Sequence, residues 1–260
     1  GIELSLNWRK EIIKDLNVDL RANLTYNKNK YVYYDEPNYE AVWKKKTGQP
    51  LSISWGYIAD GYFQNQEEID NGPDQTGLGS QLKPGDIKYR DVNGDGIIND
   101  DDKVMLSSFG SMPRIQYGLG LNLTYKKIDF GVFFNGSAQR KIMINNAMTD
   151  FGERNNNVMK CIADDHWSID NPNPEATFPR LGLKSTDIKN NTEASSHWLR
   201  NGNFIRFKTL EVGYSFPHCR VYFSGDNLAV WSPFKLWDPE LSWNTYPLQR
   251  TFNFGVQLNF

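Results

Sequence analysis

The sequence predicts an all-β protein: an antiparallel transmembrane β-barrel wall with long extracellular loops. Three observations predict this fold. Apolar and polar residues alternate over segments of about 10 to 12 residues, close to the length that a tilted membrane-spanning strand needs. Short and long connections between these segments alternate, as they do in outer-membrane barrels. Aromatic residues make up 14% of the 260 residues and often stand near segment ends, where barrels carry aromatic girdles.

The first half of the chain contains four alternating segments. In the third, Leu119 and Leu121 alternate with Gly120 and Asn122. Because successive side chains of a strand point to opposite faces, each segment has one apolar and one polar face. The four segments are residues 2–9, 18–27, 115–125 and 128–135.

The second half contains three more segments, of which the last is the most regular and the middle one is short. The fifth segment is imperfect because Arg206 and Lys208 share the parity of the apolar Leu210. We expect a β-bulge near these two residues, or their exposure above the bilayer. The three segments are residues 206–216, 219–223 and 251–260.

The connections differ greatly in length. Tight turns are expected at residues 10–16, 126–127 and 217–218, which would be periplasmic if the last strand ends in the periplasm. Long loops are expected on the extracellular side. These loops cover about residues 28–112, 137–197 and 230–248.

Alternation alone does not decide which face meets lipid. A wide membrane barrel points its apolar face outward, and the charges and amides of the opposite face suit a water-filled lumen. The alternative is a soluble β-sandwich or small barrel, in which Leu119, Leu121, Phe130 and Val256 would pack into a core.

The composition excludes several classes of protein. No run of about 18 apolar residues occurs, so a transmembrane helix is not expected. The net charge of −2 gives no indication of nucleic-acid binding. Cys161 and Cys219 fit either one disulfide or two free thiols. The neighbouring carboxylates Asp164 and Asp165 would point apart on extended backbone, and no catalytic motif appears, so we expect no enzyme and no catalytic residues.

One motif has the spacing of a calcium loop, D-x-N-x-D-G-I-x-N-x-x-D at residues 91–102. Calcium prefers six to eight oxygen ligands, and a 12-residue loop supplies them around a sharp turn at its glycine. We expect structural calcium, with an aspartate at the last position where glutamate is usual. The alternative is a metal-free turn rich in Asp, Asn and Gly. The predicted ligands are Asp91, Asn93, Asp95, the Ile97 carbonyl, Asn99 and Asp102.

Aromatic residues in the long loops are candidates for ligand binding, because flat rings stack on sugar rings or clamp a partner. Packing within the loops is the other interpretation. The candidates are Trp43, Trp55, Trp167 and Trp237.

Several stretches in a fixed order carry a family resemblance that covers nearly the whole chain. They include KPGDIKYRDVNGDG at 83–96 and WLRNGNFIR at 198–206, and the others are residues 56–69, 113–136, 210–214, 224–228 and 246–252. Together they resemble the SusC/RagA family of TonB-linked (TonB-dependent) outer-membrane transporters.

The resemblance implies the C-terminal seven or so strands of a 22-stranded barrel in the bacterial outer membrane. Residues 1–260 would all belong to this barrel portion, the plug domain would lie outside this chain, and Phe260 would be the barrel-assembly signal. The implied function is import of an oligosaccharide or peptide. The implied partners are a SusD-like surface lipoprotein, the TonB–ExbB–ExbD energising complex through a missing N-terminal region, and membrane lipid. The chain also begins inside a strand, so we expect a fragment of a longer protein.

Two alternatives belong to other functional classes. The first is a soluble calcium-containing carbohydrate-binding β module, in which tryptophans hold a glycan. The second is a surface hydrolase domain, which would need a close carboxylate pair or a nucleophile beside a base.

Overall fold

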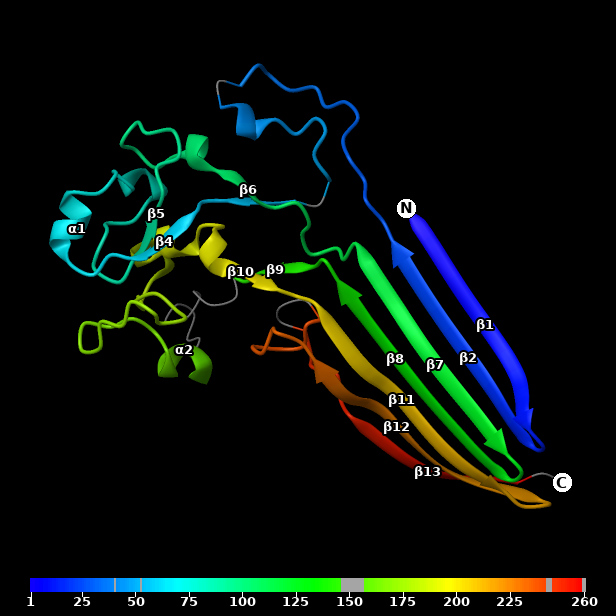
Figure 1. Ribbon diagram of the computed structural model, residues 1–260. Coiled ribbons are helices and arrows are strands. Elements are labelled where there is room, and N and C mark those ends of the chain that lie inside the picture. The colour runs from blue at the N-terminus through cyan, green and yellow to red at the C-terminus, as the bar shows by residue number, and fades with distance from the viewer. Residues whose placement is uncertain (40, 52, 146–156, 242–244, 259–260) are drawn as a thin grey trace. The chain divides into compact units, whose positions relative to one another are not determined.

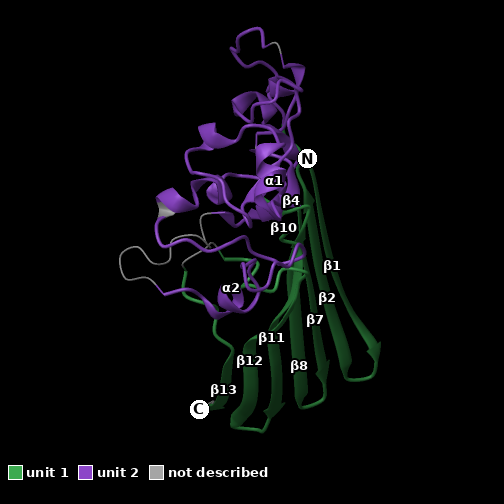
Figure 2. Cartoon of the chain, turned by 90° about the vertical axis from the view of Figure 1, so that its left-hand side faces the viewer, with its two compact units in different colours: residues 1–29, 112–140, 201–260 green, residues 30–111, 141–200 purple. Residues whose placement is uncertain are grey.

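The computed structural model describes residues 1–260 except 40, 52, 146–156, 242–244 and 259–260. The described chain forms two compact units, each assembled from separate stretches of sequence (Figure 2). Residues 1–29, 112–140 and 201–260 form the sheet unit. Residues 30–111 and 141–200 form the loop unit. The predicted assembly signal at Phe260 lies outside the described residues.

The sheet unit contains one antiparallel sheet of seven strands, which confirms the seven predicted segments (Figure 1). The strands follow one another in the order in which they occur along the chain. They are β1 (Ile2–Ile13), β2 (Leu16–Tyr26), β7 (Ile115–Tyr125), β8 (Ile128–Ala138), β11 (Phe204–Ser215), β12 (Cys219–Trp231) and β13 (Thr251–Leu258).

Cross-strand register joins like with like across this sheet. Leu121 pairs with Leu20 of β2 and with Val132 of β8, whereas the adjacent Asn122 pairs with Asp19 and Gly131. Because residues directly opposite each other share a face, the apolar residues form one continuous surface and the polar residues form the other.

The apolar face of the sheet remains open to its surroundings. Leu119 is 48% exposed and Val256 is 65% exposed. Only Phe204 and Phe234 of this unit count among the buried apolar residues of the described chain. The packed core of a soluble sandwich, which was the alternative interpretation, is therefore not present in the described residues of this unit.

A β-bulge interrupts β11 between Phe207 and Thr209, as the imperfect alternation predicts. Phe207 pairs with Phe134, while Thr209 already pairs with Phe133, so Lys208 is the extra residue. The bulge reverses the parity of the strand. Arg206 consequently shares the polar face, although its sequence parity with Leu210 assigns it to the apolar one.

The loop unit contains short elements that the alternation does not predict. Its strands are paired two by two, β3 with β6 and β4 with β5, while β9 pairs with β10 at the edge of the unit. The strands are β3 (Ser54–Gly56), β4 (Ala59–Tyr62), β5 (Ile87–Tyr89), β6 (Val104–Ser107), β9 (Lys141–Met143) and β10 (Leu199–Asn201). The helices are α1 (Gln66–Asp70) and α2 (Lys160–Asp164), and the 3₁₀ turns are η1 (Val42–Lys44), η2 (Thr76–Leu78), η3 (Asp100–Asp102), η6 (Ser185–Asp187), η7 (Lys189–Thr192) and η8 (Ser196–Trp198).

This unit has a core of its own, built from residues far apart in sequence. Tyr57, Phe63, Ile87, Phe178 and Trp198 are each at most 2% exposed. The two longest connections thus form a packed unit rather than extended loops. Among the described residues, no helix has the length and apolar character needed to span a membrane.

Candidate functional site

The calcium-like loop at residues 91–102 connects β5 to β6 within the loop unit. Gly94 and Gly96 have φ angles of +79° and +82°, a left-handed conformation that glycine adopts without a steric penalty. These two glycines let the chain turn sharply around the side chains of Asp91, Asn93 and Asp95.

Backbone N–H groups fix those three side chains. Asp91 accepts hydrogen bonds from the N–H of Gly94 at 2.6 Å and of Gly96 at 2.7 Å. Asn93 Oδ1 accepts one from the N–H of Asp95 at 3.1 Å, and Asp95 Oδ1 accepts one from the N–H of Ile97 at 2.8 Å. The Gly96 N–H, the largest contribution, lowers the pKa of Asp91, so this carboxylate is charged at neutral pH.

The base of the loop is held by Asp102 and Ile98, which are both fully buried. Asp102 accepts hydrogen bonds from the N–H of Val92 at 2.7 Å and of Asn99 at 2.9 Å, and so joins the two ends of the loop. The backbone of Ile98 donates to Asp74 at 2.8 Å. Asn99 caps η3 by accepting from the N–H of Asp101.

The glycine turn and the carboxylate and amide oxygens of this loop are of the kind that calcium sites use. The Asp91 carboxylate accepts hydrogen bonds from the N–H groups of Gly94 and Gly96, and the N–H groups of Asn93 and Asp95 also help to lower its pKa. Within the described residues, however, no three His, Cys, Asp or Glu side chains gather into a metal-holding group. The side chain of Asp102 accepts from backbone N–H groups at the base of the loop, so the predicted ligands divide into a half-buried to exposed group at 91–97 and a buried support.

The four predicted ligand-binding tryptophans lie in different environments. Trp43 is 38% exposed and donates through Nε1 to the carbonyl of Asp101 at 3.1 Å. Trp55 is half-buried in β3. Trp167 is only 3% exposed, so its ring is not accessible to a ligand in this structure. Trp237, in the sheet unit, packs edge-on against Phe234 with ring centroids 4.6 Å apart.

A cavity of about 290 Å³ brings Trp55 together with residues that the sequence analysis does not single out. Three of its lining residues are lysines: Lys44 and Lys46 belong to one short run, whereas Lys103 comes from a distant segment, so no motif marks the three as a group. One wall is η3, the end of the calcium-like loop. The described lining residues are Tyr39, Lys44, Lys46, Trp55, Asp100 and Lys103.

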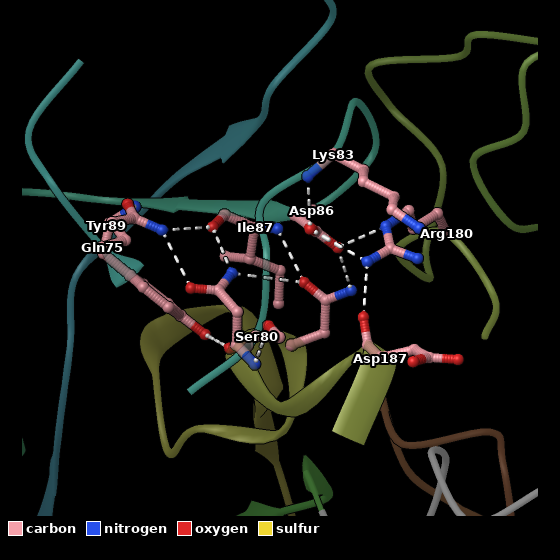
Figure 3. Close-up of polar contacts among 10 residues, drawn as sticks. Gln75, Ser80, Lys83, Asp86, Ile87, Tyr89, Arg180 and Asp187 are labelled. Atoms are coloured by element: carbon pink, nitrogen blue, oxygen red, sulfur yellow. Dashed lines mark hydrogen bonds and ion pairs between the residues drawn. The ribbon is translucent and has the colours of Figure 1, made fainter. Parts of the chain in front are cut away.

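A buried polar cluster ties the two stretches of the loop unit together (Figure 3). Asp86 is fully buried and pairs with Arg180 at 2.6 Å, and it accepts from the N–H of Lys83 and the side chain of Asn191. Burial raises the pKa of Asp86, while Arg180 opposes the shift. Sequence reasoning misses this cluster because its members lie about a hundred residues apart and follow no period.

The polar face of the sheet unit carries ion pairs rather than isolated charges. Arg220 of β12 donates to Asp129 of β8 at 3.0 Å and to Glu211 of β11 at 2.5 Å. Arg206 is 2% exposed and pairs with Asp238 at 2.6 Å and with Glu240 at 3.1 Å. A hollow of about 580 Å³, lined by both polar and apolar residues, lies on this face.

Comparison with known proteins adds relatives that match the full length of the chain. No protein-family model matches it. The chain is 29% identical to "TonB-dependent receptor P26" of Formosa agariphila and 28% identical to "TonB-dependent receptor SusC" of Bacteroides thetaiotaomicron. Each match covers 100% of this chain but only 29% and 26% of the relative.

The fold is also found in solved structures. The structure of the "RagAB peptide transporter" matches this chain with a TM-score of 0.68 and 20% identity. The match covers 99% of this chain and 28% of the RagAB chain. A second structure, of the "RagAB peptide importer in the 'closed-closed' state", has a TM-score of 0.66 and 20% identity.

The sheet of seven antiparallel strands and the packed connections define the class: an all-β chain with the fold of part of the solved RagAB structures. Within this class, the resemblance to SusC-like TonB-dependent receptors is confirmed along the whole chain. The chain spans less than a third of the length of these relatives. The relatives are named as receptors and transporters rather than as enzymes.

Proposed function

We propose that this chain is the C-terminal wall of a TonB-dependent outer-membrane transporter that imports nutrients. Its seven strands close, with strands from the rest of the protein, into a barrel of 22 strands. The connections at about 28–112, 137–197 and 230–248 face the cell exterior, and the tight turns face the periplasm. No bond is made or broken by this chain.

The exposed apolar face of the sheet carries the proposal. It runs across all seven strands, and its opposite face is lined by paired charges and amides. Lipid satisfies such an apolar face on the outside of a barrel, and water satisfies the polar face within. A soluble carbohydrate-binding module would bury its apolar face in a core.

The edges of the sheet support the same proposal. β1 and β13 are its terminal strands, and each presents an unpaired row of backbone groups. In lipid every backbone polar group needs a partner, so both edges require further strands. Phe260, at the end of the last strand segment, serves in this proposal as the signal read by the assembly machinery.

The partners follow from the resemblance. A SusD-like lipoprotein and the loop unit capture an oligosaccharide or peptide at the surface. The TonB–ExbB–ExbD complex acts through the plug outside this chain, and substrate then passes along the polar face. The solved RagAB structures are described as those of a peptide transporter, and one relative of this chain is named SusC.

The full-length receptor tests this function. Its gene is deleted in the native host, and growth and uptake are measured on oligosaccharides and peptides as sole nutrients. We expect at least one substrate to lose uptake, and complementation to restore it only when TonB is present. A receptor that fractionates with soluble proteins, or uptake that persists without TonB, would contradict the proposal.

A structural calcium ion in the 91–102 loop is part of the proposal. Asp91, Asn93, Asp95 and the Ile97 carbonyl would hold it, with Asn99 directly or through water and Asp102 as a support. The ion supplies charge that fixes the turn, and the residues themselves position the loop. Binding at a Kd of about 10⁻⁴ to 10⁻³ M is typical of extracellular calcium modules.

Calorimetry with CaCl₂ on the purified receptor measures this binding. Replacing the half-buried Asp91 and the exposed Asp95 (D91N/D95N) should abolish one calcium site and the calcium-dependent rise in melting temperature of the loop unit. The matched control D100N, at an exposed aspartate of the same segment, should bind as the unmodified receptor does. Equal binding by D91N/D95N would exclude this loop as the site.

A further inference from the structure

The cavity beside the calcium-like loop has the composition of a binding site for an anionic ring. We propose that Lys46, Trp55 and the residues around them form a surface subsite for an acidic oligosaccharide, one whose sugar rings carry carboxylate or sulfate groups. This inference rests on the proposed import function and names the substrate class for it.

Charge is the first argument. Of the described residues that line the cavity, three are lysines and one is an aspartate. Lys103 pairs with Asp100 at 2.7 Å, and Lys44 pairs with Asp101. The Lys46 ammonium lies 5.0 Å from the ring centroid of Tyr34, a cation–π contact that leaves hydrogen-bond donors available to an anion.

The aromatic walls are the second argument. Trp55 and Tyr39 supply flat, amphipathic surface at low conformational cost. Trp55 is fixed because β3 pairs with β6, where it lies opposite Met105. A sugar ring stacked on this wall brings its acidic substituent within reach of Lys46.

The form of the cavity favours a sugar over a peptide. Peptides are commonly recognised along an extended strand edge or groove. This cavity is a shallow, open hollow with a volume of about 290 Å³, and its described lining residues come from separate segments. That space suits one ring of an oligosaccharide better than a run of peptide backbone.

The calcium-like loop forms one wall, which explains the position of the cavity. η3 presents Asp100 to Lys103, while Asp101 holds Lys44 and accepts from the indole N–H of Trp43 at 3.1 Å. The turn that follows Asn99 therefore sets the positions of two of the three lysines.

Binding to the purified full-length receptor tests the subsite separately from transport. The probes are tri-galacturonate, tri-mannuronate and a sulfated galactotriose, each followed by calorimetry and tryptophan fluorescence up to about 10 mM, a range for weak sites. Fully methyl-esterified tri-galacturonate is the neutral counterpart, and tri-glutamate is the peptide counterpart.

We expect at least one acidic trisaccharide to bind. K46Q should weaken it about fivefold, as the loss of one partly exposed ion pair predicts. W55F should weaken it less than W55A. The matched control is K45Q, since Lys45 is exposed and does not line the cavity. K45Q should bind within about twofold of the unmodified receptor, a difference near the median worth of a surface charge.

The inference is overturned if no acidic trisaccharide binds, if K46Q binds like K45Q, or if the neutral or the peptide probe binds equally well. Uptake in cells separates the two proposals. If the receptor takes up a neutral glycan in a TonB-dependent way and K46Q has no effect, only the subsite proposal is refuted. If binding depends on Lys46 but the receptor imports nothing, the transport function is refuted and the subsite remains as a site of capture.

Discussion

Gly213 illustrates how one residue without a side chain organises the polar face of the sheet. It lies in β11, directly between Asp129 of β8 and Tyr222 of β12. A Cβ at this position would come within 2.6 Å of Arg220 Nη2 and of both carboxylate oxygens of Asp129. The bare backbone therefore lets Arg220 reach across a whole strand to its partner.

Replacing Gly213 by alanine should displace the Arg220–Asp129 pair. Overpacking and the partial loss of this pair should lower the stability of the barrel by about 1–3 kcal/mol. The heat-modifiable shift of the full-length receptor on a gel, followed against temperature, measures this loss. Gly120 is the control, because a Cβ there would meet Phe133 at an ordinary 3.5 Å. Equal melting of G213A and G120A would refute the steric argument.

His197 gives the loop unit a predictable dependence on pH. Burial, assisted by the charge of Arg200, lowers the pKa of His197 from 6.5 to about 4. The folded unit therefore prefers neutral histidine, and the unfolded chain binds the proton more readily. This stabilisation is fully present above about pH 6.5 and is lost as the pH falls toward 4. The loss amounts to about 2 kcal/mol at pH 5.

The variant H197Q should remove much of this acid sensitivity. Hydrogen exchange of the loop unit at pH 7.5 and pH 5 should show a smaller change for H197Q than for the unmodified receptor. H218Q is the matched control, since His218 lies in the tight turn between β11 and β12. If H197Q loses protection at pH 5 as strongly as H218Q does, His197 is not the group responsible.

At the scale of single elements, the fold of β7 and β8 was accessible from sequence alone. Their apolar residues alternate without interruption, and the turn at Lys126 is short, so period and register agree. The length of β12 was underestimated, because its regular alternation ends after Phe223 whereas the strand continues to Trp231. Asn227 has a φ of +53° opposite the bulge of β11, and this irregularity hides the strand from a period-two analysis.

The loop unit shows where sequence reasoning ends. The calcium-like spacing predicts a sharp turn at 91–102, and the structure has this turn, because a local motif fixes local hydrogen bonds. The lysine cavity and the Asp86–Arg180 pair depend on long-range packing instead. Lys46 and Lys103 are 57 positions apart, and no periodic pattern relates them.

Asp102 should be essential to the loop element even without calcium. D102A leaves the N–H groups of Val92 and Asn99 without their carboxylate, each at a cost of about 1–3 kcal/mol where buried. Hydrogen exchange should accelerate at residues 92–99 in calcium-free buffer. D100A removes an 81%-exposed carboxylate and should leave these amides protected. Unchanged exchange in D102A would show that the loop is held by other contacts.

At the scale of the whole chain, the two units are stabilised in different ways. The loop unit has a buried apolar core and an internal polar cluster. The sheet unit has paired strands and ion pairs but almost no buried apolar residues. In the proposed function, lipid covers the apolar face of this sheet, and further strands supply hydrogen-bond partners at both of its edges.

Two neighbouring residues of β7 allow this last point to be tested. Leu121 belongs to the apolar face and Asn122 to the polar face, although the two residues are adjacent in the sequence. A lysine facing lipid near the middle of the bilayer costs about 2–4 kcal/mol, whereas lumen positions tolerate charge. In the full-length receptor, L121K should therefore reduce assembly into the outer membrane and lower the temperature of the heat-modifiable shift. N122K should assemble almost normally, although it can alter uptake. If N122K proved the more damaging of the two, the apolar face would have to lie inside the protein, and transport through this wall would no longer follow from the fold.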